Sequence, residues 1–346
     1  MVTRHAWITS LSVLVACADP PISFFDEPRP CELLGEVCPP AIPTQLELVD
    51  FDPDGRDEFV ILGLEGELVV GNPEDGEVLA SARVEVEWGT TLSRCSSADL
   101  VFQHTLEQWW LWELTDARIE AADHGVLTGS YACFDLGAGA DTIVEVDADL
   151  LRVDGVEVGL GLVPPGESLR GLALRPEDES GQRFSLFGFA LDENVRMARV
   201  DLEAVEVTAA QLWPWGPTRI EVLAVAGRDL VVGGPITLDS GELAIVREID
   251  LASAPATWQV ERVSLPWWPQ QLVLAQLDDD PEPELLVAPL PISALAIIGV
   301  GDSASVQMLE LEFEGVDLAA GDVDADGLDE IFAIDPREDR ILEVEL

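Results

Sequence analysis

The chain contains no lysine, one tyrosine and three histidines among its 346 residues. Its 18 basic residues are therefore all arginine, and they face 67 acidic residues, for a formal net charge of −49 and a pI near 4.1. Such a surface repels nucleic-acid phosphates and anionic lipid headgroups, so we expect neither as a partner. We interpret the carboxylates mainly as a solvated surface, because pairs able to flank a glycosidic bond arise in any chain this acidic.

Motifs of catalysis and nucleotide binding are also missing. His5 lies in the N-terminal segment, and neither His104 nor His124 stands in a motif with a nucleophile or with metal ligands. No Walker or dinucleotide-binding sequence occurs, and no stretch has the pattern of a long amphipathic helix. These gaps disfavour an enzyme.

Long apolar runs are confined to the N-terminus. Residues 1–16 carry Arg4 and an apolar run that is too short to span a bilayer, which is typical of a signal peptide. The sequence Leu-Val-Ala-Cys that ends at Cys17 resembles the bacterial lipobox. This resemblance implies a lipidated Cys17, and an exported protein held on the periplasmic or outer surface of the bacterial (outer) membrane by acyl chains alone. An ordinary secretory signal is the alternative.

Cysteine is scarce, and without Cys17 an even number remains. Cys31 and Cys38 lie in a Pro-rich tether over residues 17–40, and we expect them to pair. Cys95 and Cys133 are predicted to lie in loop regions of neighbouring repeats, where a second disulfide is expected. Two free buried thiols are the alternative for this second pair.

Aspartate-rich loops organise the rest of the chain. Residues 322–330 and 50–58 place carboxylates at alternate positions, then a glycine, then further acidic residues, and residues 276–284 are a weaker copy. Oxygen ligands in this number suit Ca²⁺, and the glycine allows the sharp turn. The predicted side-chain ligands are Asp50, Asp52, Asp54 and Glu58; Asp278, Asp280 and Glu284; and Asp322, Asp324, Asp326 and Glu330. Backbone carbonyls of Arg56 and Leu328 are the expected additional ligands.

The last loop position, just before each apolar strand, recurs along the chain, and we call the residue at this position the ruler residue because it marks the repeat length. It falls on Glu58, Asp99, Asp141, Arg183, Asp229, Glu284 and Glu330. Intervals of roughly 41 to 55 residues match the length of a four-stranded propeller blade. The prediction is an all-β fold, a seven-bladed β-propeller over residues 41–346, forming one domain.

The acidic loops resemble those of the FG-GAP/VCBS repeats in integrin-like β-propellers. In that family the last ligand is usually Asp, whereas here Glu58 and Glu330 follow Asp57 and Asp329. Either neighbour is a candidate for the last ligand.

The seventh repeat lacks an outer strand. After Glu330 the sequence holds only two strand-like segments, 331–334 and 341–346. Residues 22–25 are a hypothetical donor of the missing strand.

Tryptophans gather just before the first strands of several blades. Trp88, Trp213, Trp215, Trp267 and Trp268 share this position, several of them beside prolines. Connections there lie opposite the acidic loops, so an aromatic rim for a ligand is predicted. The alternative is that these rings pack as wedges between blades.

The functional expectation is a non-catalytic, calcium-stabilised envelope lipoprotein, monomeric, that binds a protein or carbohydrate. The alternative is an extracytoplasmic propeller enzyme, such as a polysaccharide lyase or hydrolase, with its site at the channel mouth. A purely structural envelope component is a third reading.

Overall fold

The structure is a computed structural model. It describes residues 36–37, 43–50, 55–73, 77–86, 90–95, 100–104, 108–115, 118–126, 130–135, 141–164, 167, 169–178, 180–190, 194–216, 219–280, 282–299 and 305–346. The chain divides into residues 1–32 and 33–346, and every described residue belongs to the second unit. The predicted signal peptide, Cys17, Cys31 and Cys38 lie outside the described residues.

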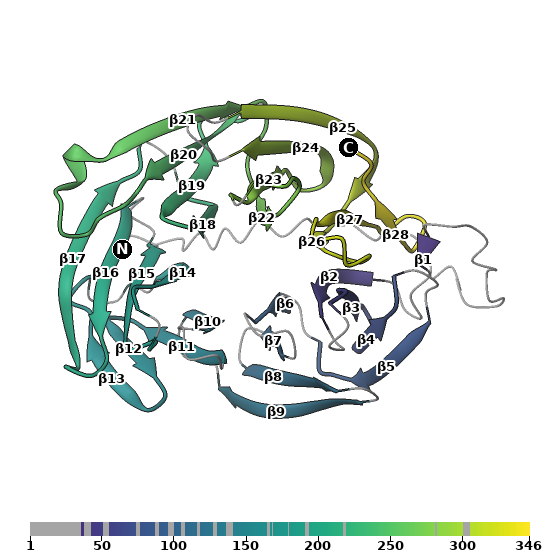
Figure 1. The fold of residues 1–346 in the computed structure, drawn as a ribbon, viewed down its shortest axis with the longest axis horizontal. Coiled ribbons are helices and arrows are strands. Elements are labelled where there is room, and N and C mark those ends of the chain that lie inside the picture. Colours follow the sequence, from purple (N-terminus) through teal and green to yellow (C-terminus); the bar gives the residue numbers. More distant parts are fainter. Residues whose placement is uncertain are drawn as a thin grey trace, which may run out of the picture. The chain divides into compact units, whose positions relative to one another are not determined.

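Within the described residues, the strands form seven four-stranded antiparallel sheets (Figure 1). In chain order the sheets comprise β2(Pro43–Val49), β3(Glu58–Gly63), β4(Glu67–Gly71) and β5(Val78–Arg83); β6(Thr91–Arg94), β7(Leu100–His104), β8(Gln108–Thr115) and β9(Arg118–Val126); β10(Ser130–Asp135), β11(Asp141–Asp147), β12(Leu150–Val153) and β13(Val156–Gly159); β14(Arg170–Pro176), β15(Arg183–Phe189), β16(Asn194–Asp201) and β17(Glu206–Pro214); β18(Val222–Ala226), β19(Asp229–Pro235), β20(Gly241–Arg247) and β21(Gln259–Leu265); β22(Gln271–Ala275), β23(Glu284–Ala288), β24(Ile292–Gly299) and β25(Ser305–Gly315); and β26(Leu318–Gly321), β27(Glu330–Asp335) and β28(Arg340–Glu343) with β1(Glu36–Val37).

The repeat ruler marks the start of the second strands. In six described sheets the second strand begins at the ruler residue itself, and β7 begins at Leu100, one residue after Asp99. The ruler residues, all acidic except Arg183, thus lie at the end of the loop between the first and second strands. An acidic loop residue followed at once by an apolar run is the signal that located these strands.

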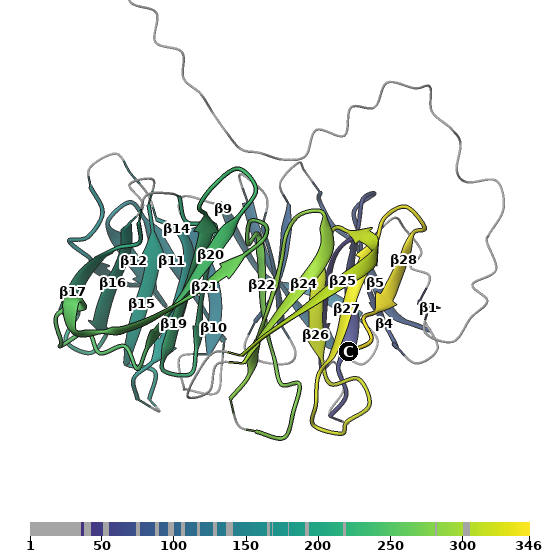
Figure 2. The same ribbon diagram turned by 90° about the horizontal axis from the view of Figure 1, so that it is seen from above.

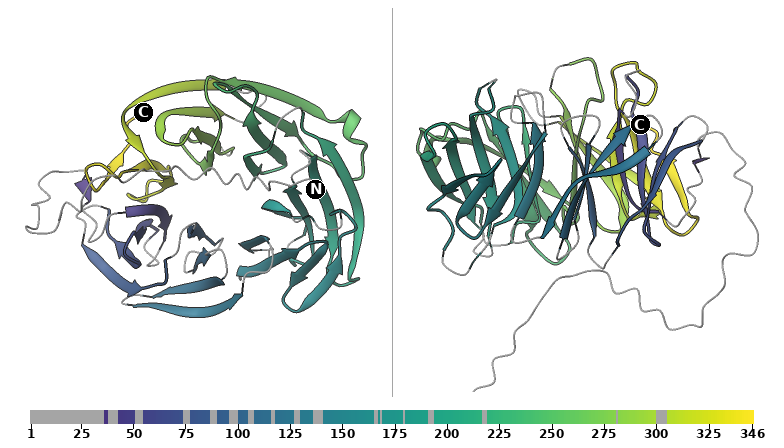
Figure 3. Two further views of the ribbon diagram at one scale, coloured as in Figure 1. Left: turned by 180° about the vertical axis from the view of Figure 1, so that it is seen from behind. Right: turned by 90° about the horizontal axis from the view of Figure 1, so that it is seen from below.

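Burial explains the composition of the strands. Second strands such as β3 and β23 are buried at every residue, because a neighbouring sheet covers each of their faces. Outer strands alternate: β25 and β17 expose every second side chain over most of their length. The first strand of each sheet lies innermost and the fourth outermost, as Figure 1 and the left view of Figure 3 show.

Apolar clusters join successive sheets. Separate clusters lie between the first and second, third and fourth, fourth and fifth, fifth and sixth, and sixth and seventh sheets. A further cluster joins the last sheet to the first, where the rings of Phe59 and Phe332 meet edge to face with centroids 4.8 Å apart. The second and third sheets are linked by the disulfide Cys95–Cys133.

The outer strand of the last sheet comes from the N-terminal side of the chain. Residues Glu36 and Val37 of β1 pair antiparallel with Leu342 and Ile341 of β28. The donor segment is therefore 36–37, and the predicted donor, residues 22–25, lies outside the described residues. An N-terminal strand in a C-terminal sheet brings the two ends of the sheet series together.

Helix is nearly absent from the described part of the chain, where the one helix is the short 3₁₀ segment η1(Pro255–Thr257). No described helix has both the length and the apolar character required to cross a bilayer.

Candidate metal and ligand sites

The acidic loop between β26 and β27 gathers three of its carboxylates. Oxygen atoms of Asp322, Asp324 and Glu330 all lie within 4.8 Å of one another. The loop turns sharply at Gly327, which has a φ of 92°, and the Gly327 N–H donates to Asp322 Oδ2 at 2.8 Å. That φ is accessible to glycine without strain, which explains the glycine of the motif. The arrangement offers several oxygen ligands to one hard cation.

Asp326 has a different role in this loop. Its Oδ1 accepts the Leu328 N–H at 2.9 Å, and its own N–H donates to Asp322 and Asp324, each at 3.1 Å. The Asp326 carboxylate is not among the three that gather. It shapes the turn that brings the other carboxylates together.

The structure separates the two candidates for the last ligand of this loop. The Glu330 carboxylate joins the group, with Oε2 also accepting the Val323 N–H at 3.0 Å. Asp329 instead turns to the preceding sheet, where its Oδ2 accepts the Gln276 N–H at 2.7 Å. Its own N–H donates to the Gln276 carbonyl at 2.7 Å. Glu330 therefore lies with the carboxylate group of its own loop, and Asp329 joins the two sheets.

Burial disfavours the charged form of two carboxylates in this loop. Burial, and then the charges of Asp324 and Asp322, raise the pKa of Glu330 above its ordinary value, against the opposing Val323 N–H. Burial likewise raises the pKa of Asp329, opposed by the Gln276 N–H and Arg94 and reinforced by Asp57 and Asp322. Burial is the largest cause of both shifts.

The loop between β22 and β23 repeats the arrangement. Oxygens of Asp278, Asp280 and Glu284 lie within 4.8 Å of one another, and Glu284 Oε2 accepts the Leu277 N–H at 2.9 Å. Glu284 thus occupies the place that Glu330 has in the last loop. Both loops project beyond the same end of the strands in their sheets (Figure 2).

The first acidic loop is described only in part. Asp52 and Asp54 lie outside the described residues, whereas Asp50, Arg56 and Glu58 are inside them. Asp57 repeats the behaviour of Asp329: its N–H donates to the Asp322 carbonyl at 2.7 Å, and its Oδ2 accepts the Asp322 N–H at 3.2 Å. Asp57 therefore joins the first sheet to the last.

In the fourth and fifth sheets, which lack an acidic loop, arginine stands at or near the ruler position. Asp229, the ruler residue of the fifth sheet, accepts from Arg247 Nη1 at 2.8 Å and from the Glu248 N–H at 2.7 Å. In the fourth sheet the ruler residue is itself Arg183, with Nε 3.0 Å from Asp178. Protein cations there neutralise the carboxylates.

The predicted tryptophan rim is only partly exposed. Trp213 and Trp215 are 7% and 1% exposed, in the cluster between the fourth and fifth sheets, and Arg262 stacks over Trp215 at 5.4 Å. These two rings have the wedge position and offer no open face to a ligand. Trp88 lies outside the described residues.

Trp267 and Trp268 are half-buried in the connection that enters β22. This connection lies at the opposite end of β22 from the acidic loop. Trp268 Nε1 donates to the Thr237 carbonyl at 2.6 Å, and the Arg219 guanidinium lies 5.6 Å from a Trp268 ring centroid. Leu238, next to Thr237, is 86% exposed. These residues form a partly apolar platform.

Two acidic groups beside the joint of first and last sheets were not expected from the sequence. Asp317 accepts from the Leu46 N–H at 2.8 Å and from Gln271 Nε2 at 2.5 Å, which links three sheets. Burial raises the pKa of Asp317 to about 6. Burial, and then the charge of Asp317, raise the pKa of Glu47 to about 8, with Arg94 opposing.

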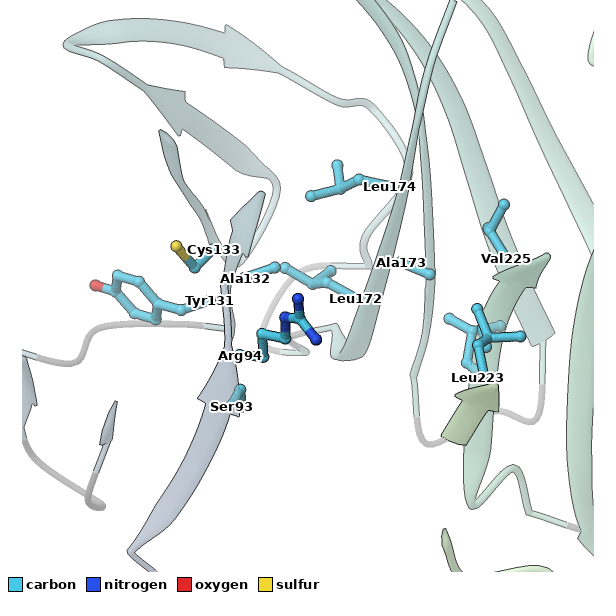
Figure 4. Close-up of a pocket in the computed structure, with 12 residues that line it drawn as sticks. Ser93, Arg94, Tyr131, Ala132, Cys133, Leu172, Ala173, Leu174, Leu223 and Val225 are labelled. Carbon is cyan, nitrogen blue, oxygen red and sulfur yellow. The ribbon is translucent and has the colours of Figure 1, made fainter. Parts of the chain in front are cut away.

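A cavity of about 340 Å³ lies among the first strands of five consecutive sheets, β6, β10, β14, β18 and β22 (Figure 4). Its lining includes Arg94, the single tyrosine Tyr131 and several aliphatic side chains. The predicted disulfide is present beside it: Cys133 lines the cavity and bonds to Cys95, with Cα atoms 5.0 Å apart.

No protein-family model matches the chain, and no curated protein matches it. Solved structures do match. The chain superposes with a TM-score of 0.59 on the Myceliophteria thermophila Cps50 (Swd1) β-propeller domain, at 15% identity over 91% of this chain and 100% of that one. The fold is that of a β-propeller. A structure of BBS1N in complex with ARL6DN matches at 0.58, with 11% identity over 89% and 91% of the chains, and Kuenenia stuttgartiensis hydrazine synthase at 0.59, with 10% identity over 90% and 97%. At these identities the likeness concerns the fold alone.

Proposed function

We propose that residues 41–346 form a closed seven-bladed propeller of FG-GAP/VCBS type, stabilised by Ca²⁺, which acts without catalysis as a binding module of the bacterial cell envelope. Its ligand is a protein or a glycan. A lipid on Cys17 anchors it to the membrane, and the folded unit is a monomer.

The observation that carries this proposal is the repeated carboxylate group. Loops in two adjacent sheets bring the same residue types together, with Glu284 and Glu330 in equivalent places. A merely solvated acidic surface has no reason to converge in register, since like charges repel. Carboxylate oxygens around a turn with free backbone carbonyls are the donors that Ca²⁺ prefers.

The connections between sheets support a structural role for the ion. Asp322 belongs to the carboxylate group, and its backbone N–H and C=O both bond to Asp57 of the first sheet. An ion that orders the loop around Asp322 also orders the contact that joins the last sheet to the first. Binding to the folded state alone raises stability by mass action, by about 2.7 kcal/mol per site at a hundredfold excess over Kd.

The platform around Trp268 supports a ligand on the face opposite the ions. An indole ring beside an exposed leucine presents apolar area with a polar edge, which suits a sugar face or a peptide side chain. Arg219, which pairs with Glu221, adds a guanidinium beside this ring in a chain that is strongly acidic.

Calcium content tests the proposal. The full chain carrying Cys17→Ser, which removes the expected acyl anchor, should bind two or three Ca²⁺ ions by calorimetry and by metal analysis. Asp324→Ala should remove one ion. The matched control is Asp239→Ala, an exposed aspartate in another hairpin loop, which should leave the ion count unchanged. Equal counts in both variants would contradict the proposed site.

Membrane anchoring is tested separately. Expressed in a bacterium, the unaltered chain should partition with membranes and carry acyl groups on Cys17 by mass spectrometry, whereas Cys17→Ser should be released in soluble form. Cleavage before a different residue, with no acyl modification, would support the ordinary secretory signal instead.

A further inference from the structure

The cavity among the first strands has an aliphatic wall. Leu172 and Ala173 of β14, Leu223 and Val225 of β18, and Leu274 of β22 line one side of it. Leu274 remains 36% exposed there. Aliphatic groups left in a concave, water-accessible site gain free energy when an apolar ligand covers them. The volume of about 340 Å³ falls at the small end of the range typical of small-molecule sites.

Arg94 is the one charged residue in the described lining of the cavity. Figure 4 shows its side chain extending between Ala132 and Leu172. Its Nη1 lies 3.3 Å from Asp57 Oδ2, and the described residues provide no other side-chain partner for the guanidinium. A guanidinium carries five N–H donors, so several remain available to a ligand.

Among the described residues, one carboxylate pairs directly with Arg94. Asp57 is this ion-pair partner at 3.3 Å, and Glu47 and Asp329 are further acidic groups close enough to interact with the guanidinium. Burial raises the pKa of Glu47 to about 8, so Glu47 is mostly neutral at pH 7, and the Asp329 carboxylate accepts the Gln276 N–H at 2.7 Å. The cavity therefore offers a guanidinium with a single direct ion-pair partner, within a chain of net charge −49.

We propose that this cavity is a binding site for a small amphipathic carboxylate, whose aliphatic tail lies on the wall formed by β14, β18 and β22 and whose carboxylate pairs with Arg94. A guanidinium matches a carboxylate in charge and in planar geometry. The site meets the first acidic loop only at the pair of Arg94 with Asp57, and it is distinct from the Trp268 platform. It requires neither bound calcium nor a macromolecular ligand.

Calorimetry with three probes of equal chain length tests the site. The full chain carrying Cys17→Ser should bind one octanoate, bind 1-octanol at least about tenfold more weakly, and bind octyltrimethylammonium more weakly still. Arg94→Gln should reduce the affinity for octanoate to that for octanol and leave octanol binding unchanged. Arg118→Gln is the matched control, since Arg118 is exposed on β9, where it pairs with Glu120 at 3.3 Å; it should change neither octanoate nor octanol binding.

A second variant addresses the apolar wall without altering charge. Ala224→Phe should fill the cavity and abolish binding of both octanoate and octanol, while circular dichroism shows an unchanged fold; Ala224 lines the cavity from β18. Octanoate binding no tighter than that of octyltrimethylammonium, unaltered binding in Ala224→Phe, or no binding at millimolar octanoate would each overturn the proposal. Because the ion count is measured separately, failure here leaves the calcium proposal standing, and the reverse also holds.

Discussion

At the scale of single residues, the neighbouring side chains of Asp329 and Glu330 in the last loop make different contacts. Glu330 joins the carboxylate group of its own loop, whereas Asp329 bonds to the backbone of the preceding sheet. Asp57 repeats the second role toward Asp322. The sequence shows that an Asp-Glu pair ends both the first and the last acidic loop. It does not show which residue of the pair contacts the neighbouring sheet, because that depends on the direction of each side chain in the folded protein.

Glu47 provides a prediction about pH. Its pKa is raised to about 8 in the folded protein, so the folded state keeps a proton that the unfolded chain loses near its ordinary pKa. Stability should therefore fall as pH rises from about 4.5 to about 8. Glu47→Gln should remove this fall and be more stable than the unaltered chain at pH 8.5, by on the order of 2 kcal/mol.

Urea unfolding in chelator at pH 5 and pH 8.5 checks this prediction. Glu310→Gln, an exposed carboxylate on β25, serves as the control and should follow the unaltered chain at both pH values. If Glu47→Gln lost as much stability between the two pH values as the control, the Glu47 carboxyl would not be the cause.

At the scale of elements, the hydrogen bonds between Asp57 and Asp322 join the first and last sheets, and we expect them to stabilise the fold with or without a bound ion. Asp57 is 8% exposed and accepts from the Asp322 N–H and from Arg94. Asp57→Ala leaves those donors without their partner, which we expect to lower the free energy of unfolding by about 1–3 kcal/mol. The loss should persist in chelator, whereas the loss from Asp324→Ala should occur only in calcium. Losses that both vanish in chelator would assign Asp57 to the ion site.

The disulfide gives a second prediction for elements. Cys95 and Cys133 are separated by 38 residues and join the second and third sheets. Closing a loop of that length in the unfolded chain is worth up to about 4 kcal/mol on the chain-entropy account. Cys133→Ser, or reduction of the unaltered chain, should lower the melting temperature by several degrees. No change on reduction would mean that the bond contributes nothing to stability.

The strands themselves were largely predictable from sequence, and their partners were not. Acidic loop residues followed by buried apolar runs mark second strands such as those starting at Glu58, Glu284 and Glu330. The donor of the last outer strand was misplaced, because two residues at 36–37 carry no periodic signal. Trp213 and Trp215 share sequence features with Trp268, yet packing between sheets buries the first two. Burial of this kind depends on the neighbouring sheet and is invisible in a local pattern.

At the scale of the whole molecule, the net negative charge bears on the contact between the first and last sheets. A net charge of −49 works against a compact state through self-repulsion. The contacts between first and last sheets include Asp57 with Asp322, and Asp317 with Leu46, so acidic groups stand at the joint itself. Bound cations would lower the repulsion where the proposed ring closes.

The most direct test is a thermal melt of the full chain carrying Cys17→Ser in Ca²⁺, in Mg²⁺ and in chelator, at matched ionic strength so that general screening is equal. We predict a melting temperature at least about 5 °C higher in Ca²⁺ than in chelator, with Mg²⁺ much less effective and Asp324→Ala losing part of the gain. Identical melts in Ca²⁺ and chelator, together with no metal in the protein, would contradict the account and make the aspartate loops acidic turns without ions.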